Sequence, residues 1–416
     1  MDPSTVNSSL MRRMLKFCLY SSAYPIVFFI QKIKRFKFIK LAELDHSRIG
    51  HTIYITDGFL AARGFSDELK NCKIILFSSF FVCNTQIKKM IKRVIPLSFF
   101  RYFFIFLKKA FLYWNKKDHV LNTSKFNLPA LLTDKKLNID YKKSNLFFTE
   151  KEKRKGLELI KKFGLKENDK WICIHNRDSA YLDRTQPNNN WSYHDHRNFS
   201  IEKLKMASEF FADNGYYVFR MGREQKEKLI SKNKKIIDYA NSSSKSDFLD
   251  VYLSANSDFY FGSDSGLKGI SISFMRPCYG INWSPMLLYS DPGLFINSNN
   301  KYHPWLFIFK RAKSLKTGKM LTLKEILETK PLYSHNSNIF MKNNIGFVDN
   351  DSKEIKSLAE EIIMEKEEKS IENKEDIKIK NEFWKIYFKY SGKEKIRGIT
   401  PRISPTFLRN NIDLLN

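Results

Sequence analysis

From Thr149 onward, short apolar runs alternate with polar segments of helical periodicity, and this alternation constrains the fold more than any other feature. The runs typical of buried strands are residues 171–174, 216–221, 236–237 and 259–261. Because parallel strands need crossover connections, which helices usually supply, the spacing predicts a parallel, doubly wound α/β sheet. A strand–loop–helix–strand pattern over residues 38–77 predicts a second unit of the same class.

The composition divides the chain into four regions. Residues 1–37 form a hydrophobic and basic segment, 38–148 a first Rossmann-like domain, 149–348 a second one, and 349–416 a helical extension. A polar, lysine- and asparagine-rich linker at 116–145 precedes the second domain, and Thr149 with Glu152 fits a capping box that starts a helix. We therefore expect two Rossmann-like domains with a cleft between them, plus an N-terminal helix.

The net charge of +28 over 416 residues indicates an anionic partner. Most of the excess is lysine scattered among Asn, Ile and Phe, with no zinc spacing, arginine-rich stripe or aromatic RNA-binding motif. We expect an anionic membrane surface or a nucleotide rather than nucleic acid. The five cysteines are widely spaced without a CxxC, which favours reduced thiols and a cytoplasmic location, and no signal-peptide cleavage pattern is recognisable.

Two apolar segments are candidates for membrane contact. Residues 14–30 contain Lys16 and Pro25, are flanked by Lys and Arg, and fall short of the ~20 apolar residues that a span requires. We expect an interfacial helix attracted to anionic lipid, at the inner face of the cytoplasmic membrane. Residues 97–114 are rich in Phe, and a core helix is favoured there over a membrane-facing one.

Residues 259–282 contain the main candidate for an anion site. A strand at 259–261 ends at Gly262, and Ser263, Asp264 and Ser265 then precede an apolar segment that is typical of a helix. Small hydroxyl residues at a strand-to-helix turn offer N–H and O–H donors to an anion at the helix start. The alternative is an ordinary Ser N-cap with Asp in the first turn, and this stretch alone does not decide between the two.

Two neighbouring strand ends also carry polar residues. His175 and Arg177 follow one strand, and Arg220 and Gly222 lie at the end of the next. The carboxyl ends of parallel strands meet along one edge of a sheet, so these side chains are expected to share a crevice. A guanidinium group bonds two phosphate oxygens at once. We expect His175, Arg177 and Arg220 to supply the charge that a diphosphate needs.

Several motifs resemble a bacterial glycosyltransferase family that is similar to the GT-B fucosyltransferase-like enzymes. They are HNRDSAYL (175–182), HDHRN (194–198), FRMG (219–222), KSDFLDVYLSANSDFYFGSDSG (245–266) and ISPTFLR (403–409). The resemblance covers most of the chain from about residue 40. It implies two Rossmann-like domains, with the donor nucleotide-sugar held mainly by the C-terminal one.

The resemblance also implies roles for individual residues. In the relatives, a His-x-Arg motif lies against the donor diphosphate, which maps onto His175 and Arg177. A Ser-rich turn of the relatives touches the nucleotide or its phosphates, which maps onto the turn at 263–265. The relatives often continue the His-x-Arg motif with a second basic residue. This chain has Asp178 there instead and so departs from that donor contact.

The reaction implied is metal-independent glycosyl transfer, in which Arg177 and the turn at 263–265 neutralise the leaving diphosphate. Asp349-Asn350-Asp351 matches a DxD metal motif, but it precedes a Lys/Glu-rich helix and is better explained as an N-cap. An inverting transfer also needs a general base. The candidates, which the sequence does not rank, are Asp178, His51, Asp45 and Asp195.

Other polar residues lie in the loops. The longest loop of the second domain contains Tyr181, Arg197 and Asn198, which together with His51 are candidates for acceptor contact or for a segment that covers the substrate. His194 and His196 resemble a metal-ligand pair but lack a third ligand at a useful spacing, so no metal site is expected. Asp247 and Asp250 share a helix start, where Asp247 is expected to act as a cap.

The sequence therefore predicts a membrane-associated glycosyltransferase of hexosyl or fucosyl type, acting in surface polysaccharide or lipopolysaccharide synthesis. Its donor is a nucleotide-diphospho-sugar, its acceptor a glycan or a lipid-linked glycan, and no cofactor is expected. The alternative is a non-catalytic nucleotide- or glycan-binding protein of the same fold. A nucleic-acid-binding protein is less favoured. The sugar, the nucleotide base, the acceptor, the stereochemical outcome and the oligomeric state stay open.

Overall fold

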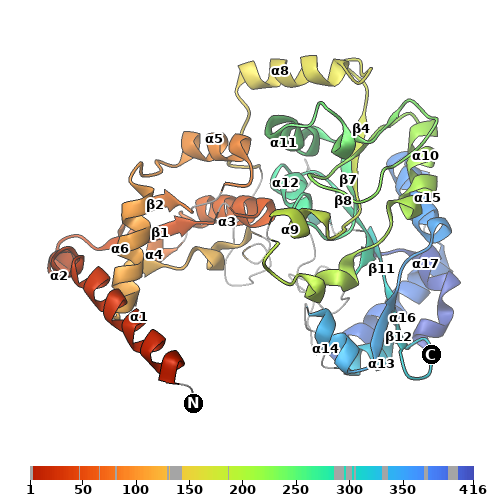
Figure 1. The fold of residues 1–416 in the computed structure, drawn as a ribbon. Coiled ribbons are helices and arrows are strands. Elements are labelled where there is room, and N and C mark those ends of the chain that lie inside the picture. Colours follow the sequence, from red (N-terminus) through yellow and green to blue (C-terminus); the bar gives the residue numbers. More distant parts are fainter. Residues whose placement is uncertain are drawn as a thin grey trace. The chain divides into compact units, whose positions relative to one another are not determined.

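A computed structural model describes residues 3–45, 47–64, 66–79, 82–128, 131, 143–185, 187–284, 295–296, 302–303, 306–329, 336–369, 373–391 and 402–416 (Figure 1). The chain divides into two compact units, unit 1 (Met1–Leu131) and unit 2 (Leu132–Asn416). Each unit contains a parallel β-sheet with helices packed on it, which confirms the α/β class.

Unit 1 has a three-stranded parallel sheet in the order β2-β1-β3. The strands are β1 (Ile39–Leu44), β2 (Lys73–Ser78) and β3 (Val120–Leu121). The α-helices are α1 (Pro3–Ser21), α2 (Tyr24–Lys32), α3 (Ile49–Ala62), α4 (Asp67–Lys70), α5 (Thr85–Val94) and α6 (Arg101–Tyr113). Short 3₁₀ turns lie at η1 (Ile33–Arg35), η2 (Lys117–His119) and η3 (Thr123–Phe126). The segment expected to be an irregular linker therefore contains a strand of the sheet, β3, directly after the 3₁₀ turn η2.

The N-terminal segment belongs to unit 1. Ala23, at the N-cap of α2, and Val27 on this helix are buried together with Leu107, Ala110 and Phe111 of α6, and this cluster also includes residues of β1 and β2. The region 1–37, expected as a separate segment, thus packs on the sheet of unit 1. The region 97–114, expected as a core helix, is buried on one side only.

Unit 2 has a seven-stranded sheet in the order β14-β11-β8-β7-β4-β5-β6, in which all the pairs of strands are parallel. Its strands are β4 (Trp171–His175), β5 (Tyr217–Arg220), β6 (Ile236–Ile237), β7 (Phe259–Gly262), β8 (Cys278–Trp283), β11 (Leu306–Phe309) and β14 (Arg402–Ile403). Two antiparallel pairs join β9 (Phe295–Ile296) to β10 (Tyr302–His303) and β12 (Arg311–Ser314) to β13 (Ile345–Val348).

Helices pack around this sheet and link its strands. Those before β8 are α8 (Glu150–Lys161), α9 (Ala180–Thr185), α10 (Lys205–Asp213), α11 (Asp247–Asn256) and α12 (Lys268–Ser273). Those after it are α13 (Leu323–Glu328), α14 (Ser337–Lys342), α15 (Ser352–Lys366), α16 (Lys374–Ser391) and α17 (Pro405–Asn410). The 3₁₀ turns are η4 (Ser192–Arg197), η5 (Ile201–Leu204), η6 (Tyr239–Asn241) and η9 (Ile412–Leu415). Thr149 caps α8 in the predicted capping box with Glu152.

The region 349–416 is integrated into unit 2, although its composition indicated a helical extension. Its strand β14 pairs with β11 at the edge of the large sheet, and Ile403 is fully buried. Helix α15 packs against α10, and α17 packs against α16. The pairing of β14 brings these C-terminal helices back to the sheet, and a two-residue strand is too short for periodicity to reveal.

Candidate functional site

The order of the strands in unit 2 reverses between β4 and β7. From β4 the chain proceeds to β5 and β6 on one side, and then returns to add β7 and β8 on the other side. In open parallel sheets, ligands bind at the carboxyl ends of the strands where the order reverses, because the connecting loops diverge there. The residues that follow β4 and β7 therefore form the candidate site.

Gly262 allows the two strand ends to approach each other closely. It is paired with His175 across the sheet, and a Cβ at this position would lie 2.3 Å from the His175 carbonyl oxygen. Beyond it, the Ser263 N–H donates to the same carbonyl at 3.2 Å. The loop after β7 is thereby fixed against the end of β4.

Arg177 supplies a positive charge at this edge of the sheet without a direct acidic partner among the described residues, although Asp264, Asp195 and Asp178 lie near enough to favour its charged form. Its Nη1 donates to the His194 carbonyl at 2.9 Å and to Asn198 Oδ1 at 3.1 Å, both of which are neutral acceptors. Within the described part of the chain it forms no ion pair. Burial and the neighbouring Arg197 lower the pKa of Arg177 to about 10, so the partly buried guanidinium stays charged at neutral pH.

His175 contributes no charge, contrary to the expectation from the sequence. Burial, followed by the repulsion of Arg220, Arg177 and Arg197, lowers the pKa of His175 to about 3. Its imidazole is therefore neutral at physiological pH, and its buried Nδ1 has no hydrogen-bond partner. A buried polar atom without a partner costs about 1–3 kcal/mol, so this nitrogen favours a polar ligand.

Two further cations lie on the β7 side of the site. Arg197 Nη2 donates to the Asp264 carbonyl oxygen at 2.7 Å and to its Oδ2 at 3.0 Å. Lys268 Nζ lies 2.7 Å from Asp264 Oδ1 and 4.3 Å from the centre of the Trp283 ring. Asp264, predicted to contact the donor, therefore holds two cations through its carboxylate.

The turn at 263–265 is not a helix N-cap. Helix α12 begins only at Lys268, its N-cap position is Leu267, and no side chain caps it. The Tyr260 hydroxyl instead supports the turn, because it donates to the Ser263 carbonyl at 2.8 Å and lies 3.1 Å from Ser265 Oγ. Ser263 Oγ is buried and has no hydrogen-bond partner, so the hydroxyl rather than a helix start is the feature suited to a ligand.

Arg220 is turned into the protein, although the sequence placed it among the donor-binding residues. It is fully buried, and its guanidinium donates to Asp238 at 3.2 Å, to Asn176 Oδ1 at 3.2 Å and to Gln225 Oε1 at 2.7 Å. Its charge is thus compensated by Asp238. Gly222 has a φ of 150°, and a Cβ at this position would collide with the side chain of Gln225. Because Gln225 bonds Arg220, Gly222 lies beside the same buried hydrogen-bond network.

Sequence reasoning missed Lys310, which follows β11 and reaches the same loop. Its Nζ donates to the Asn198 carbonyl at 2.7 Å and pairs with Asp349 Oδ1 at 2.7 Å. Asp349 also pairs with Lys203 at 2.9 Å. A lysine directly after the apolar run 306–309 was the available signal, but that run was not recognised as a strand. Lys268 was missed for a similar reason, since an i, i+4 acid–base pair is common on helix surfaces.

The DxD motif has no metal-binding geometry. Asp351 forms a capping box with Glu354 at the start of α15, as predicted. Asn350 is buried and exchanges two hydrogen bonds with Asn282. Among the described residues, no group of three or more His, Cys, Asp or Glu side chains could hold a metal ion.

The loop after β4 is held by its own polar residues. Both carboxylate oxygens of Asp178 accept backbone N–H groups, from Ala180 at 3.0 Å and from Lys226 at 2.9 Å. Asp178, predicted to be catalytic, therefore shapes the loop. His196 is buried beside Phe340 and Phe347, with its Nδ1 2.8 Å from Ser337 Oγ.

The structure also positions the remaining loop residues. Asn198 and Arg197 lie in the site through the contacts given above, while Tyr181 lies on α9 and is half-buried. Ser246, rather than Asp247, is the N-cap of α11, and Asp247 pairs with Arg223 at 3.5 Å. Burial raises the pKa of Asp250 to about 6, and its Oδ1 accepts a hydrogen bond from the Tyr239 hydroxyl.

The remaining general-base candidates differ in their surroundings. In unit 1, Asp45 follows β1 and His51 lies in the first turn of α3, with His51 Nδ1 3.7 Å from Asp45 Oδ2. The imidazole and the Ser47 N–H hold the pKa of Asp45 well below its usual range. Both side chains are accessible. In unit 2, burial raises the pKa of Asp195, which accepts a hydrogen bond from Asn198.

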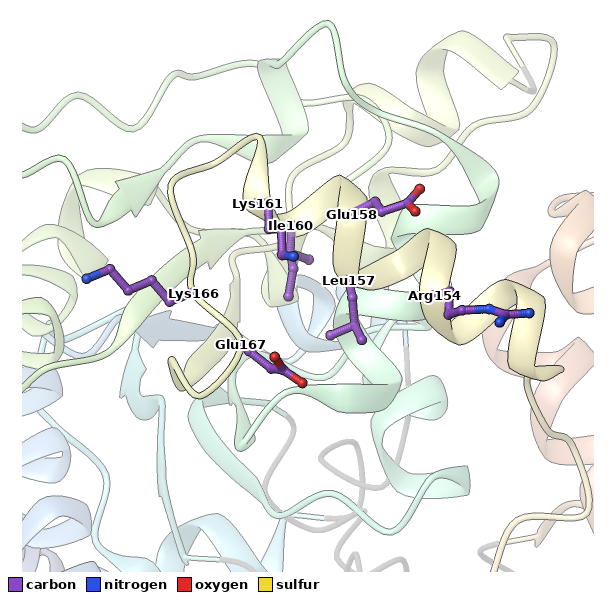
Figure 2. Close-up of a pocket in the computed structure, with 7 residues that line it drawn as sticks. All are labelled: Arg154, Leu157, Glu158, Ile160, Lys161, Lys166 and Glu167. Atoms are coloured by element: carbon purple, nitrogen blue, oxygen red, sulfur yellow. The ribbon is translucent and has the colours of Figure 1, made fainter.

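A shallow hollow on α8 lies outside this site (Figure 2). Its lining includes Arg154 and Glu158 on the helix and Lys166 and Glu167 in the loop that follows. That loop leads into the amino end of β4, so the hollow lies at the opposite edge of the sheet from Arg177. Its charged side chains are solvent-exposed and of both signs, as on an ordinary protein surface.

No protein-family model matches the sequence, and no curated protein matches it. Among solved structures, the chain is similar to the glycosyl transferase family 9 protein from Veillonella parvula DSM 2008, with 10% identity and a TM-score of 0.35 over 59% of this chain and 80% of that one. It is also similar to the E. coli ADP-heptose lps heptosyltransferase II, with 12% identity and a TM-score of 0.34 over 58% of this chain and 84% of that one.

Proposed function

We propose that this protein is a glycosyltransferase that uses a nucleotide-diphospho-sugar donor. The observation that carries the proposal is Arg177, a partly buried cation at the reversal point of the sheet whose hydrogen bonds go only to neutral acceptors. An unpaired charge in a partly desolvated position is unfavourable unless an anion completes it. A diphosphate matches the guanidinium geometry, and the motif resemblance of the sequence supports a nucleotide-sugar as the ligand.

The site chemistry suits departure of a nucleoside diphosphate. As the acceptor oxygen bonds to the anomeric carbon, the bond from that carbon to the diphosphate breaks and its electron pair stays on the phosphate oxygen. Arg177 stabilises this growing negative charge. Arg197 and Lys268, which both contact Asp264, add to this stabilisation. The Ser263 hydroxyl and the neutral His175 ring contribute hydrogen bonds. In this scheme no metal ion is needed.

In an inverting transfer, a base must take the proton of the acceptor hydroxyl. We assign this role to the pair His51 and Asp45, because both are accessible and the carboxylate is placed to stabilise a protonated imidazole. Asp178 is less suitable because both of its oxygens already accept backbone N–H groups. The acceptor proposed is a glycan or lipid-linked glycan of a surface polysaccharide or lipopolysaccharide.

The decisive variant is Arg177→Ala. The assay measures nucleotide release from GDP-, UDP-, CMP- and ADP-sugars, and the panel includes hexosyl, fucosyl and heptosyl donors. Membrane extract supplies the acceptor. Loss of one preorganised donor to the leaving group is expected to lower kcat by roughly a hundredfold or more. The matched control is Arg184→Ala, because Arg184 on α9 is exposed and pairs with Glu224.

Three outcomes decide the proposal. Loss of release in Arg177→Ala, with full release in Arg184→Ala and in wild type after EDTA treatment, supports metal-independent transfer. Equal release in wild type and Arg177→Ala overturns the assignment of the site. Tight nucleotide binding by wild type without release from any donor favours the non-catalytic binding protein instead.

A further inference from the structure

Exposed aromatic side chains are concentrated in unit 1. Among the described residues, ten of the eleven exposed Phe and Tyr side chains lie there, although unit 2 is the larger unit. All but Phe36 of these ten belong to residues 17–29 and 99–113. Phe99 and Phe100 are 91% and 67% exposed, and Phe29 is 63% exposed. A concentration of exposed aromatic side chains on one part of a protein is typical of an interaction surface.

The two segments form one layer of helices. Helix α6 packs against both α1 and α2, and α1 runs obliquely from this contact toward the N-terminus (Figure 1). The Tyr20 ring stacks on that of Phe106 and is tilted against that of Tyr113, and Trp114 Nε1 donates to the Tyr20 carbonyl at 3.1 Å. The exposed side chains of this layer are here called the aromatic surface: Phe17, Tyr24, Phe28, Phe29, Phe99, Phe100, Tyr102, Phe103 and Tyr113.

The charges on the helices that carry the aromatic surface are all of one sign. Residues 3–42 and 71–117 contain no Asp or Glu, so α1, α2, α5 and α6 carry basic side chains alone. Exposed Arg12, Arg13 and Lys16 lie on α1, and Lys32 ends α2. Burial, followed by the repulsion of Arg101 and Lys92, lowers the pKa of Lys88. The nearest acidic partners lie outside these helices, at Asp118 beside Lys34 and at Glu43 beside Lys108. Helices that carry an apolar surface and basic side chains alone are complementary to anionic lipid.

We propose that the aromatic surface inserts into the headgroup region of an anionic bilayer, with the surrounding Lys and Arg side chains bound to lipid phosphates. Aromatic rings are favoured at this depth, and basic groups near an anionic leaflet are attracted to its phosphates. The inner side of α2 is occupied by packing on α6, which leaves the outer side for lipid. The surface thus places unit 1 on the membrane, next to lipid-linked acceptors.

Among the described residues, no single helix is long and apolar enough to cross a bilayer, while Met11–Ser21 and Tyr24–Arg35, bent by 51° from each other, pass by length and composition as a pair. The test therefore includes extraction at alkaline pH, which releases peripheral proteins and retains spanning ones.

The experiment is cosedimentation of the full-length protein with vesicles that mix phosphatidylglycerol and phosphatidylcholine, compared with vesicles of phosphatidylcholine alone. Wild type is expected to bind the mixed vesicles preferentially and to be released by salt and by alkaline extraction. Phe99→Ser/Phe100→Ser is expected to lower the binding about tenfold, because two exposed rings no longer enter the interface. The matched control Ile230→Ser, at a residue of unit 2 that is 68% exposed, should bind like wild type.

The charge contribution is tested separately. Arg12→Glu/Arg13→Glu is expected to remove the preference for phosphatidylglycerol. Equal binding to both kinds of vesicle by wild type, or unchanged binding by Phe99→Ser/Phe100→Ser, overturns the proposal. Retention after alkaline extraction also overturns it, because the surface would then cross the bilayer. A wild-type dimer in sedimentation velocity that Phe99→Ser/Phe100→Ser dissociates overturns it as well, because the surface would then bind a second copy. None of these readouts depends on the proposed glycosyl transfer.

Discussion

At the scale of single residues, the charge of the candidate site comes from different side chains than the sequence indicates. His175, Arg177 and Arg220 occupy neighbouring strand ends, but only Arg177 keeps a charge that no acidic side chain pairs with. Burial neutralises His175, and Asp238 compensates Arg220. Sequence position predicts which residues reach the edge of the sheet, whereas burial and partners, which decide their charge, depend on segments distant in sequence.

The same physics gives a prediction for His196. Burial, followed by the repulsion of Arg197, His194, Lys310 and Arg177, lowers the pKa of His196 to about 3 from its ordinary 6.5. The unfolded chain therefore binds a proton below pH 6.5 that the folded chain refuses until about pH 3. The free energy of unfolding must fall as the pH falls through this range, by about 2 kcal/mol at about pH 5 for this one group.

His196→Gln should accordingly flatten the pH dependence of the melting temperature between about pH 6.5 and pH 5, measured by calorimetry. Ser337→Ala is the matched control, because it removes the hydroxyl next to Nδ1 and leaves the histidine in place. Curves of equal slope for wild type and His196→Gln would show that the imidazole is not buried in neutral form.

At the scale of elements, the β4–β7 pair determines the site. The strands around 171–174 and 259–261 were predictable because apolar runs bounded by polar turns are typical of buried strands. The turn after β7 was not, because Ser263 and Asp264 fit an N-cap pattern while the helix starts at Lys268. The turn is held by Tyr260 on β7, whose hydroxyl donates a hydrogen bond to the Ser263 carbonyl. Such a contact leaves no periodic signal in the sequence.

Gly262→Ala tests how closely the two strand ends must approach. The new methyl group would meet the backbone oxygen and nitrogen of His175 at 2.3 and 3.0 Å, and backbone cannot move aside as a flexible side chain can. We expect a loss of about 2 kcal/mol in the free energy of unfolding, together with weaker nucleotide binding. Calorimetry and nucleotide titration measure both.

The control for this substitution is Gly64→Ala, because a Cβ there has no heavy atom within 4 Å. It should leave both quantities near the wild-type values. A Gly262→Ala protein with unchanged stability would mean that the strand ends separate without penalty.

At the scale of the whole molecule, the two parallel-sheet units were predictable from alternating strands and helices, but their limits were not. The 1–37 segment packs into unit 1 through Ala23 and Val27, and the 349–416 region adds β14 to the sheet of unit 2. Both depend on contacts across long sequence separations. Removing residues 1–35 would therefore uncover Leu107 and Phe111, so surface substitutions such as Phe99→Ser/Phe100→Ser separate membrane binding from folding more cleanly.

The last prediction concerns the carboxylate of Asp45, which lies beside His51 in unit 1. Asp45→Asn keeps the shape of the side chain, including an oxygen that can accept the Ser47 N–H, and removes the negative charge beside His51. We expect kcat for sugar transfer to fall roughly a hundredfold, while nucleotide affinity, assigned to unit 2, stays the same.

Asp118→Asn is the control, since Asp118 is an accessible acid of unit 1 that pairs with Lys34. It should retain wild-type kcat. If Asp45→Asn instead weakened nucleotide binding and left kcat intact, the pair would belong to substrate binding rather than to proton removal.

The position of β14 has a consequence for how the protein is made. During synthesis β11 emerges from the ribosome about 95 residues before its partner at Arg402–Ile403. At roughly 5–20 residues per second, its outer edge stays without a neighbour for about 5–20 seconds. An unpaired edge strand is a template for pairing with another chain. Each nascent chain therefore passes through an interval in which β11 can pair wrongly with other nascent chains on the same mRNA.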